Sequence, residues 1–365
     1  MQRPHDRSRT GMWWRPLRAG LLAFALPAGW SCATDDHAAY SVASSGTAVQ
    51  SQAFPRSRSG YSLRPVFTIG QAEGDSTAML GFVADAAFGP GGSIFVADAG
   101  QQRIVVYDSN GHFVRSFGRS GQGPGEFLDP SSLTLYGDTL FVYDSRQGRI
   151  TVLDTAGVYQ RAVAPPSTFV RHLRADPEGR LLLTIAADSF LVSRVTSTGK
   201  GVQRYIPRPA VESSLAPEDT PEPGPVCTQP DGFVYANPWL LELVKVDAAT
   251  GREVWGYRQP SRILRPITAS GGRSGTVTRG GGMLGLVCTD VHLFLGYLDL
   301  QSGIIHYDVF SATGEPLARL EFRRDGEPVY PGFVADGRGT RILAFRTRPY
   351  PQVSVWDVET GPASP

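Results

Sequence analysis

A histidine and a carboxylate stand at corresponding places in two repeats of this sequence. His172, in VRHLRAD, lies where an inner strand of its repeat begins, and Asp85 holds the same place in an earlier repeat. Together they could bind a divalent metal such as Ca²⁺ or Zn²⁺, or polarise a ligand. The alternative is a solvated polar rim without a ligand. If the protein is an enzyme, we expect a metal-dependent hydrolase with these two residues at its centre.

Other catalytic patterns are not found in the sequence. No two of the histidines have the H-x-x-x-H spacing of metal ligands; they are His5, His37, His112, His172, His292 and His306. There is no G-x-S-x-G nucleophile motif, and the glycine-rich GRSGQGPGEF opens no helix. We therefore favour a binding module over an enzyme, with no assigned catalytic residue and no required cofactor.

Two acid–guanidinium pairs recur with one spacing. Asp98 is followed five residues later by Arg103, and Asp144 in the same way by Arg149. Each pair falls at a turn between two strands, where the aspartate can order the turn and pair with the arginine. That structural role is the simpler interpretation, although both arginines retain donors for a ligand.

Further candidates for ligand binding come from the less regular repeats. They combine arginine with aromatic and amide side chains, which are common at recognition surfaces. They are Asn237, Trp239, Arg346, Arg348 and Tyr350. The alternative is that they fill space between repeats.

A larger pattern positions all of these residues. One segment, IFVADAGQQRIVVYDSNG, recurs further along the chain in a similar form, LFVYDSRQGRITVLDTAG. Pairs of predicted strands, each followed by a turn that ends in glycine, continue to the C-terminus. The turns end at Gly111, Gly157, Gly199, Gly251, Gly314 and Gly361. Repeats of this size predict an all-β, six-bladed β-propeller with four antiparallel strands in each blade. Within it, Tyr107, Phe141, Tyr143, Phe294 and Trp356 should be core between blades.

The last repeat lacks an outer strand, because few residues follow Gly361. The segment PVFTIG, residues 65–70, aligns with the outer strand of the first complete repeat. We expect it to complete the last blade and to close the ring, which leaves no exposed sheet edge at the seam.

The first two repeats also resemble a known family. FGRSGQGPGEFLDP (residues 117–130) and ADAGQQRIVVYD are similar to the NHL repeat, and the resemblance fades beyond the second blade. It implies the propeller fold and, for most members, a platform that binds protein, peptide, glycan or nucleic acid. A minority of related propellers are enzymes, including calcium-dependent lactonases, so the resemblance implies as the alternative a metal-dependent hydrolase or lactonase with its site at the mouth of the central channel. Relatives that are lyases carry ligand histidines in turns that here read GQQR and RQGR, which argues against a zinc lyase.

The N-terminus is typical of an export signal. Arginines precede an apolar run from Ala19 to Trp30 that is too short to span a bilayer, and Met12 offers an alternative start. Residues 1–33 are predicted to be a signal peptide, 34–60 a flexible linker and 61–365 the propeller. Cys32 is either the lipidated residue of a lipoprotein or part of an ordinary cleavage site. The expected location is the periplasm, the outer membrane or the cell surface.

The composition of the chain limits the classes of partner that we expect. The net charge of +1 gives no support for nucleic-acid binding, and membrane contact is expected only through a lipid anchor. We expect a monomer whose loop-rich face binds protein, peptide or glycan. Two long loops on that face, residues 204–225 and 259–283, carry opposite charge and either close over the channel as a lid or are independent insertions.

Cys227 and Cys288 both occur in V-C-T sequences before the second strand of their repeats. Equivalent positions in successive blades are related by a rotation, which would point both side chains the same way around the ring. We therefore expect two buried free thiols rather than a disulfide.

Overall fold

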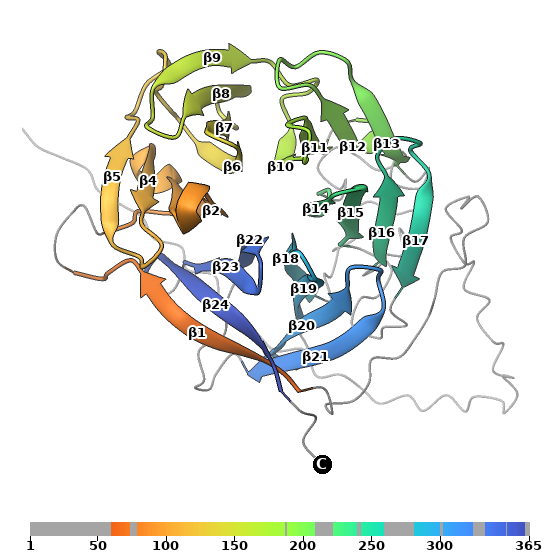
Figure 1. The fold of residues 1–365 in the computed structure, drawn as a ribbon. Helices are drawn as coiled ribbons and strands as arrows, with labels where there is room; N and C mark the ends of the chain where they lie inside the picture. Colours follow the sequence, from red (N-terminus) through yellow and green to blue (C-terminus); the bar gives the residue numbers. More distant parts are fainter. Residues whose placement is uncertain are drawn as a thin grey trace, which may run out of the picture. The chain divides into compact units, whose positions relative to one another are not determined.

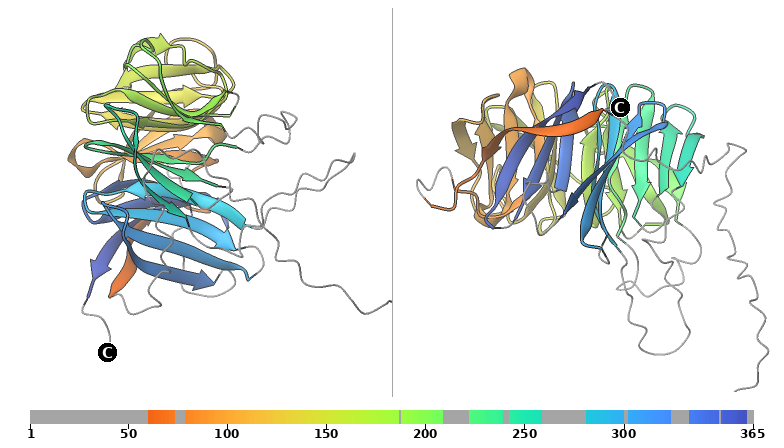
Figure 2. Two further views of the ribbon diagram at one scale, coloured as in Figure 1. Left: turned by 90° about the vertical axis from the view of Figure 1, so that its right-hand side faces the viewer. Right: turned by 90° about the horizontal axis from the view of Figure 1, so that it is seen from below.

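The computed structural model describes residues 60–73, 79–186, 188–208, 222–238, 242–258, 281–299, 302–323, 333–347 and 349–361. These residues form six antiparallel sheets of four strands each, arranged as blades around a central axis (Figure 1). Seen from the edge, the blades stand side by side with their strands running between two opposite faces (Figure 2). The predicted six-bladed β-propeller is confirmed.

Blades one to three follow each other along the chain, and each runs from its inner to its outer strand. Blade one contains β2 (Val83–Phe88), β3 (Ile94–Asp98), β4 (Arg103–Tyr107) and β5 (Phe113–Phe117). Blade two contains β6 (Pro130–Tyr136), β7 (Thr139–Asp144), β8 (Arg149–Asp154) and β9 (Tyr159–Val163). Blade three contains β10 (Val170–Ala175), β11 (Leu181–Ile185), β12 (Phe190–Val195) and β13 (Gln203–Pro207).

Blades four and five keep this order, and blade six departs from it. Blade four contains β14 (Val226–Gln229), β15 (Gly232–Asn237), β16 (Glu242–Asp247) and β17 (Glu253–Arg258). Blade five contains β18 (Gly281–Cys288), β19 (His292–Asp299), β20 (Ile304–Ser311) and β21 (Pro316–Arg323). Blade six contains β22 (Phe333–Arg338), β23 (Arg341–Arg346), β24 (Gln352–Thr360) and, as its outer strand, β1 (Tyr61–Ile69).

The N-terminal strand closes the ring, as the sequence predicted. β1 pairs antiparallel with β24 from Tyr61 opposite Thr360 to Ile69 opposite Val353. The strand begins four residues before the predicted Pro65, and a bulge after Pro65 accommodates the residue that has no N–H to donate.

The core consists of apolar layers between neighbouring blades. The aromatic residues predicted for it are all buried, with at most 2% of the residue exposed; they are Tyr107, Phe141, Tyr143, Phe294 and Trp356. Burying one such side chain contributes about 1.5–3 kcal/mol, so these layers are a main source of stability.

The repeated turn glycines have a packing reason besides their turn geometry. Gly111 and Gly157 have φ values of 84° and 94°, a region that favours glycine. A Cβ on Gly157 would lie 2.4 Å from Phe117, and one on Gly111 would lie 2.7 Å from Phe67. In both cases the ring belongs to the outer strand of the preceding blade, so the glycine lets that strand pack closely against the next blade.

The expectation of free thiols is wrong, because Cys227 and Cys288 form a disulfide with a Cα–Cα distance of 5.5 Å. The V-C-T sequences are not structurally equivalent. Cys227 lies two residues before Gln229, which pairs with the start of the next strand, whereas Cys288 lies one residue before the corresponding Thr289. A one-residue shift moves a side chain to the other face of a strand. The two cysteines therefore face each other between blades four and five.

Candidate functional site

Bulges at one level of the ring aim polar side chains at its axis. The inner strands β2, β10 and β22 each carry a bulge, after Val83, Val170 and Val334 respectively. The residues that resume the pairing are Asp85, His172 and Asp336, so these three occupy equivalent positions in blades one, three and six. Bulges commonly re-aim side chains at functional sites.

Asp85 is buried and receives hydrogen bonds on both carboxylate oxygens. Its Oδ2 accepts from Ser132 Oγ at 2.8 Å and from the Leu133 N–H at 3.1 Å, and Oδ1 accepts from the Ala86 N–H at 2.9 Å. Arg174 Nη1 lies 3.0 Å from the same Oδ2. The carboxylate thus links blades one, two and three.

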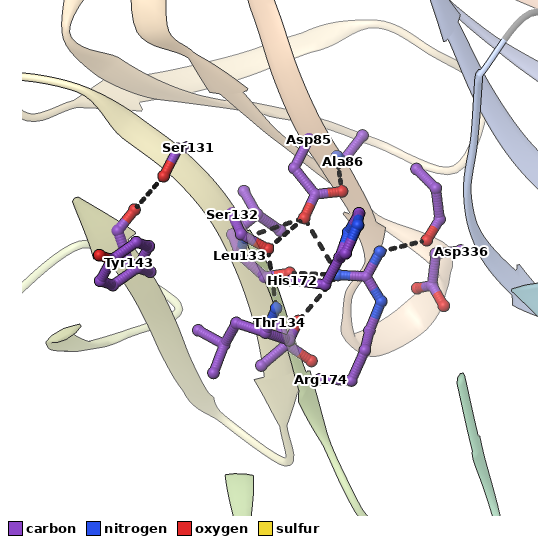
Figure 3. Close-up of polar contacts among 12 residues, drawn as sticks. Asp85, Ala86, Ser131, Ser132, Leu133, Thr134, Tyr143, His172, Arg174 and Asp336 are labelled. Carbon is purple, nitrogen blue, oxygen red and sulfur yellow. Dashed lines mark hydrogen bonds and ion pairs between the residues drawn. The ribbon is translucent and has the colours of Figure 1, made fainter. Parts of the chain in front are cut away.

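Arg174 crosses the channel (Figure 3). From blade three it donates to Asp85 in blade one and, through Nη2, to the Ala335 carbonyl in blade six at 2.8 Å. It also donates to the Leu133 carbonyl of blade two at 3.4 Å and to the carbonyl of Leu173 at 2.8 Å. Burial alone would lower the pKa of Arg174, but the carboxylates of Asp85 and Asp336 outweigh it and raise the pKa, so the guanidinium stays charged.

His172 lies beside this ion pair as a neutral imidazole. Burial in the channel wall lowers its pKa to about 4, and the positive charge of Arg174 lowers it further while Asp85 opposes the shift. Part of the residue is nevertheless exposed, so a molecule in the channel can reach it. A neutral imidazole offers one donor and one acceptor.

Asp336 is the third member of the ring and lies in blade six. Burial raises the pKa of its carboxyl, and the charge of Arg174 opposes that shift. Its Oδ2 accepts from the Phe88 N–H of blade one at 2.8 Å, which couples the two blades at the ring seam.

The residues present do not fit a divalent cation. Three donors occupy Oδ2 of Asp85 and one occupies Oδ1, and the guanidinium of Arg174 stands 3.0 Å from Oδ2, where it would repel a metal ion. Within the described ranges, no three His, Cys, Asp or Glu side chains are grouped as metal ligands would be. The arrangement instead offers hydrogen bonds beside a fixed, partly neutralised cation.

Three phenylalanines surround the mouth of the channel above these residues. Phe82, Phe169 and Phe333 each stand three residues before the polar member of their repeat and are 50%, 55% and 41% exposed. The inner strands all run from the same face (Figure 1), and each phenylalanine stands at or next to the start of its inner strand, so the three residues lie on that face around the axis. Phe333 also stacks on Phe345 with ring centroids 5.5 Å apart.

Sequence reasoning identified Asp85 and His172 but missed the motif that contains them. FVAD at residues 82–85, FVRH at 169–172 and FVAD at 333–336 are the same element in three blades. A search for short repeats at blade spacing would have found it. Arg174 carried no sequence signal, because its role depends on which blades face each other across the ring.

Asp98 and Arg103 organise a turn. Asp98 is fully buried, its Oδ1 accepts the N–H groups of Gly81 and Phe82 at 2.9 and 3.0 Å, and its Oδ2 accepts from Arg103 Nε at 3.1 Å. Arg103 also donates to the Met79 carbonyl at 2.8 Å.

Asp144 does the same in blade two with different partners. It accepts the N–H groups of Leu128 and Gln147 at 2.7 and 3.0 Å, and Arg149 donates to the Gly123 carbonyl at 2.9 Å instead of to Asp144. The expected pairing of aspartate and arginine across the turn therefore holds in blade one and not in blade two.

The remaining candidates are not gathered at one point. Asn237 is buried at the end of β15, Arg346 Nη2 donates to Gln352 at 2.9 Å, and Tyr350 is half-buried. Trp239, Arg348, Cys32 and most of the two long loops lie outside the described residues.

Comparisons with known proteins agree with this architecture. Residues 90–170 match a family model, DUF5128, described as a 6-bladed beta-propeller. The chain is a six-bladed β-propeller. No curated protein matches the propeller sequence significantly.

Two solved structures share the fold of this propeller at low sequence identity. A candidate exported protein from Bacteroides fragilis NCTC 9343 is 12% identical, with a TM-score of 0.61 over 82% of this chain and 95% of that one. A member of the duf4221 family from Bacteroides vulgatus ATCC 8482 is 11% identical, with a TM-score of 0.55 over 84% of this chain and 100% of that one. Within the described part of the propeller, no helix is long and apolar enough to cross a membrane.

Proposed function

We propose that this propeller is an exported binding module of the NHL-like type whose ligand enters the central channel from the face that carries Phe82, Phe169 and Phe333. The single observation that supports this is the threefold FV-x-D/H element. It repeats an exposed phenylalanine above a polar side chain in three blades. Aromatic rings that recur at one place in three blades and stay exposed are common anchors in binding sites.

The chemistry of the mouth indicates the kind of ligand. Three rings offer an apolar rim, and below them the neutral imidazole of His172 offers one donor and one acceptor. Asp85 and Arg174 are held in place by their own hydrogen bonds and would change little on binding. The ligand we propose therefore has an apolar group and a hydrogen-bonding group, as a peptide segment does.

Export is part of the proposal. A disulfide between Cys227 and Cys288 favours an oxidising compartment, and residues 1–33 have the pattern of a signal peptide followed by a linker to residue 60. Cys32 remains the candidate for lipidation. The description of the Bacteroides fragilis neighbour as a candidate exported protein agrees with this location.

The test is comparative capture. Purified protein and the Phe82→Ala, Phe169→Ala, Phe333→Ala triple variant are immobilised and exposed to a surface extract of the producing cells. We expect a peptide or protein retained by the wild type and reduced at least tenfold on the triple variant. Equal retention on both would overturn the channel mouth as the binding site.

Val158→Ala is the matched control. Val158 is 61% exposed, but it lies in the turn between β8 and β9, on the opposite face. We expect this variant to retain whatever the wild type retains. Loss of capture in both variants would show a general loss of exposed apolar surface rather than loss of a site.

A further inference from the structure

A second cavity opens on the face opposite the phenylalanine rim. It lies between blades three and four, holds about 300 Å³, and is lined by the turns after β10, β14 and β16. Its polar and charged lining residues are Asp176, Glu178, Arg180, Arg194, Gln229, Asp231 and Asp247. Leu182 and two prolines supply apolar walls. This volume is at the lower end of the range for small-molecule sites.

The cavity exists because blade three departs from the repeat. In blade one, Phe95 on the second strand pairs with Val106 on the third. In blade three, the same two positions are Leu182 and Arg194. The smaller Leu182 leaves space where the other blade has an aromatic ring, and the larger Arg194 brings a cation to the wall of that space.

Blade two confirms which residues belong to the repeat. There Phe141 pairs with Val152, and Val152 with Arg161 on the outer strand. Arg161 donates to the Ser197 carbonyl in the next blade at 3.1 Å. Blade two thus ties itself to its neighbour with an outer-strand arginine and keeps the layer beneath it apolar.

Arg194 performs the same interblade contact from inside the layer and has a nitrogen to spare. It donates to the Ala248 carbonyl of blade four and through Nε to Gln203 at 2.8 Å. Its Nη1 is buried and has no hydrogen-bond acceptor among the described residues. The nearest carboxylate oxygen, Asp176 Oδ2, is 4.0 Å away. A buried donor without an acceptor favours any oxygen atom that can reach it.

The carboxylates in the cavity wall are already paired, and they differ in exposure, since Asp176 is only 4% exposed. Asp176 accepts from Arg180 Nε at 2.7 Å, Asp231 from Lys245 at 2.5 Å, and Asp247 from the Thr250 N–H at 2.7 Å. Each retains lone pairs for further donors, and the side chain of Asp231 is 70% exposed. These acidic groups disfavour an anion, while the guanidinium inside disfavours a cation.

We propose that this cavity, between Arg194 and the carboxylates of Asp231 and Asp247, binds a neutral polyhydroxylated ligand of the size of one sugar unit. A hydroxyl group accepts from a guanidinium and donates to a carboxylate at the same time. A molecule with several hydroxyls can therefore satisfy the spare donor inside and the acceptors outside without adding charge. The apolar prolines and Leu182 suit the C–H faces of such a ring.

The test uses saturation-transfer NMR on the whole protein with D-glucose, D-galactose, D-mannose and N-acetyl-D-glucosamine. At least one of these should bind with a Kd on the order of 1 mM. Leu182→Phe restores the residue of blades one and two and fills the cavity, so it should weaken binding at least tenfold. Ala249→Leu, at an exposed lining position, blocks the opening without touching the core and should do the same.

Two controls separate this site from the channel. Leu182→Met conserves side-chain volume and should bind as the wild type does. The triple phenylalanine variant should also bind normally, so failure of one proposal leaves the other standing. Three results would each overturn the proposal. The first is that none of the four sugars binds at concentrations on the order of 10 mM. The others are binding that persists in both blocking variants and preferential binding of inorganic phosphate.

Discussion

Replacing Arg174 with methionine should destabilise the whole propeller, because one side chain joins four blades at the axis. The substitution keeps most of the apolar stem and removes the guanidinium together with hydrogen bonds to Asp85, Leu133, Leu173 and Ala335. Breaking a buried ion pair by removing one partner costs about 3–5 kcal/mol. The side chains of Arg174 and Asp85 are only 14% and 7% exposed, so little of this is screened by solvent.

We expect the free energy of unfolding to fall by about 3 kcal/mol, near the lower end of that range, because water in the channel can reach some of the freed carbonyl groups. The assay is urea unfolding followed by tryptophan fluorescence, in which the midpoint should fall while the slope stays unchanged. A double variant, Arg174→Met with Asp85→Asn, removes the stranded charge. The free energy of unfolding that it loses should be smaller, by at least about 1 kcal/mol, than the sum of the losses of the two single variants.

Two results would refute this reasoning. A single-variant loss below about 1 kcal/mol would mean that Arg174 is solvated and contributes no more than a surface charge. Additive losses in the double variant would mean that Asp85 is held by Ser132 and the backbone alone. Either outcome would also weaken the view that the polar residues under the channel mouth are preorganised.

Gly157→Ala should lower the free energy of unfolding by about 2 kcal/mol in a thermal melt, because its Cβ would meet a neighbouring ring. Gly137→Ala, also at positive φ but in open space, should lower it by less. Equal losses in the two variants would disprove the packing argument. Alkylation of unfolded, unreduced protein should leave Cys227 and Cys288 unlabelled, and reduction should lower stability by about 4 kcal/mol for this loop. NMR titration should show His172 neutral until about pH 4. Since its folded pKa lies below the unfolded value, stability should fall as pH drops from 6.5 to 4, and a normal titration near 6.5 would contradict the buried site.

The fold could be predicted because each blade repeats a local pattern. The sequence alone shows the strand pairs, the turn glycines and the lack of a strand after Gly361. Counting the strands of each repeat then shows that the last blade needs a fourth strand, which β1 supplies. The sequence predicts that these glycines lie in turns, but it does not predict their packing role, because Gly157 and Phe117 belong to two different blades.

The polar centre could be predicted only in part. Asp85 and His172 were identified from their corresponding places, whereas the reach of Arg174 to Ala335 requires knowing that blades three and six face each other. The error on Cys227 and Cys288 had the opposite cause. The shared V-C-T sequence suggested equivalent positions, but Cys288 lies one residue nearer to its turn than Cys227 does, and strand register converts that difference into a change of face.

Pairing of β1 with β24 also determines the order in which the molecule can be completed. The first strand of the propeller must wait, unpaired, until nearly the last residues of the chain arrive beside it. Contacts so distant in sequence make folding slow and leave strand edges open to other chains in the meantime. Under the export proposed above, with the N-terminus crossing first, blade six would be the last to form, and the covalent link between blades four and five would precede it. The seam is therefore the place where a chaperone, a protease or a second unfolded copy would find this protein most accessible.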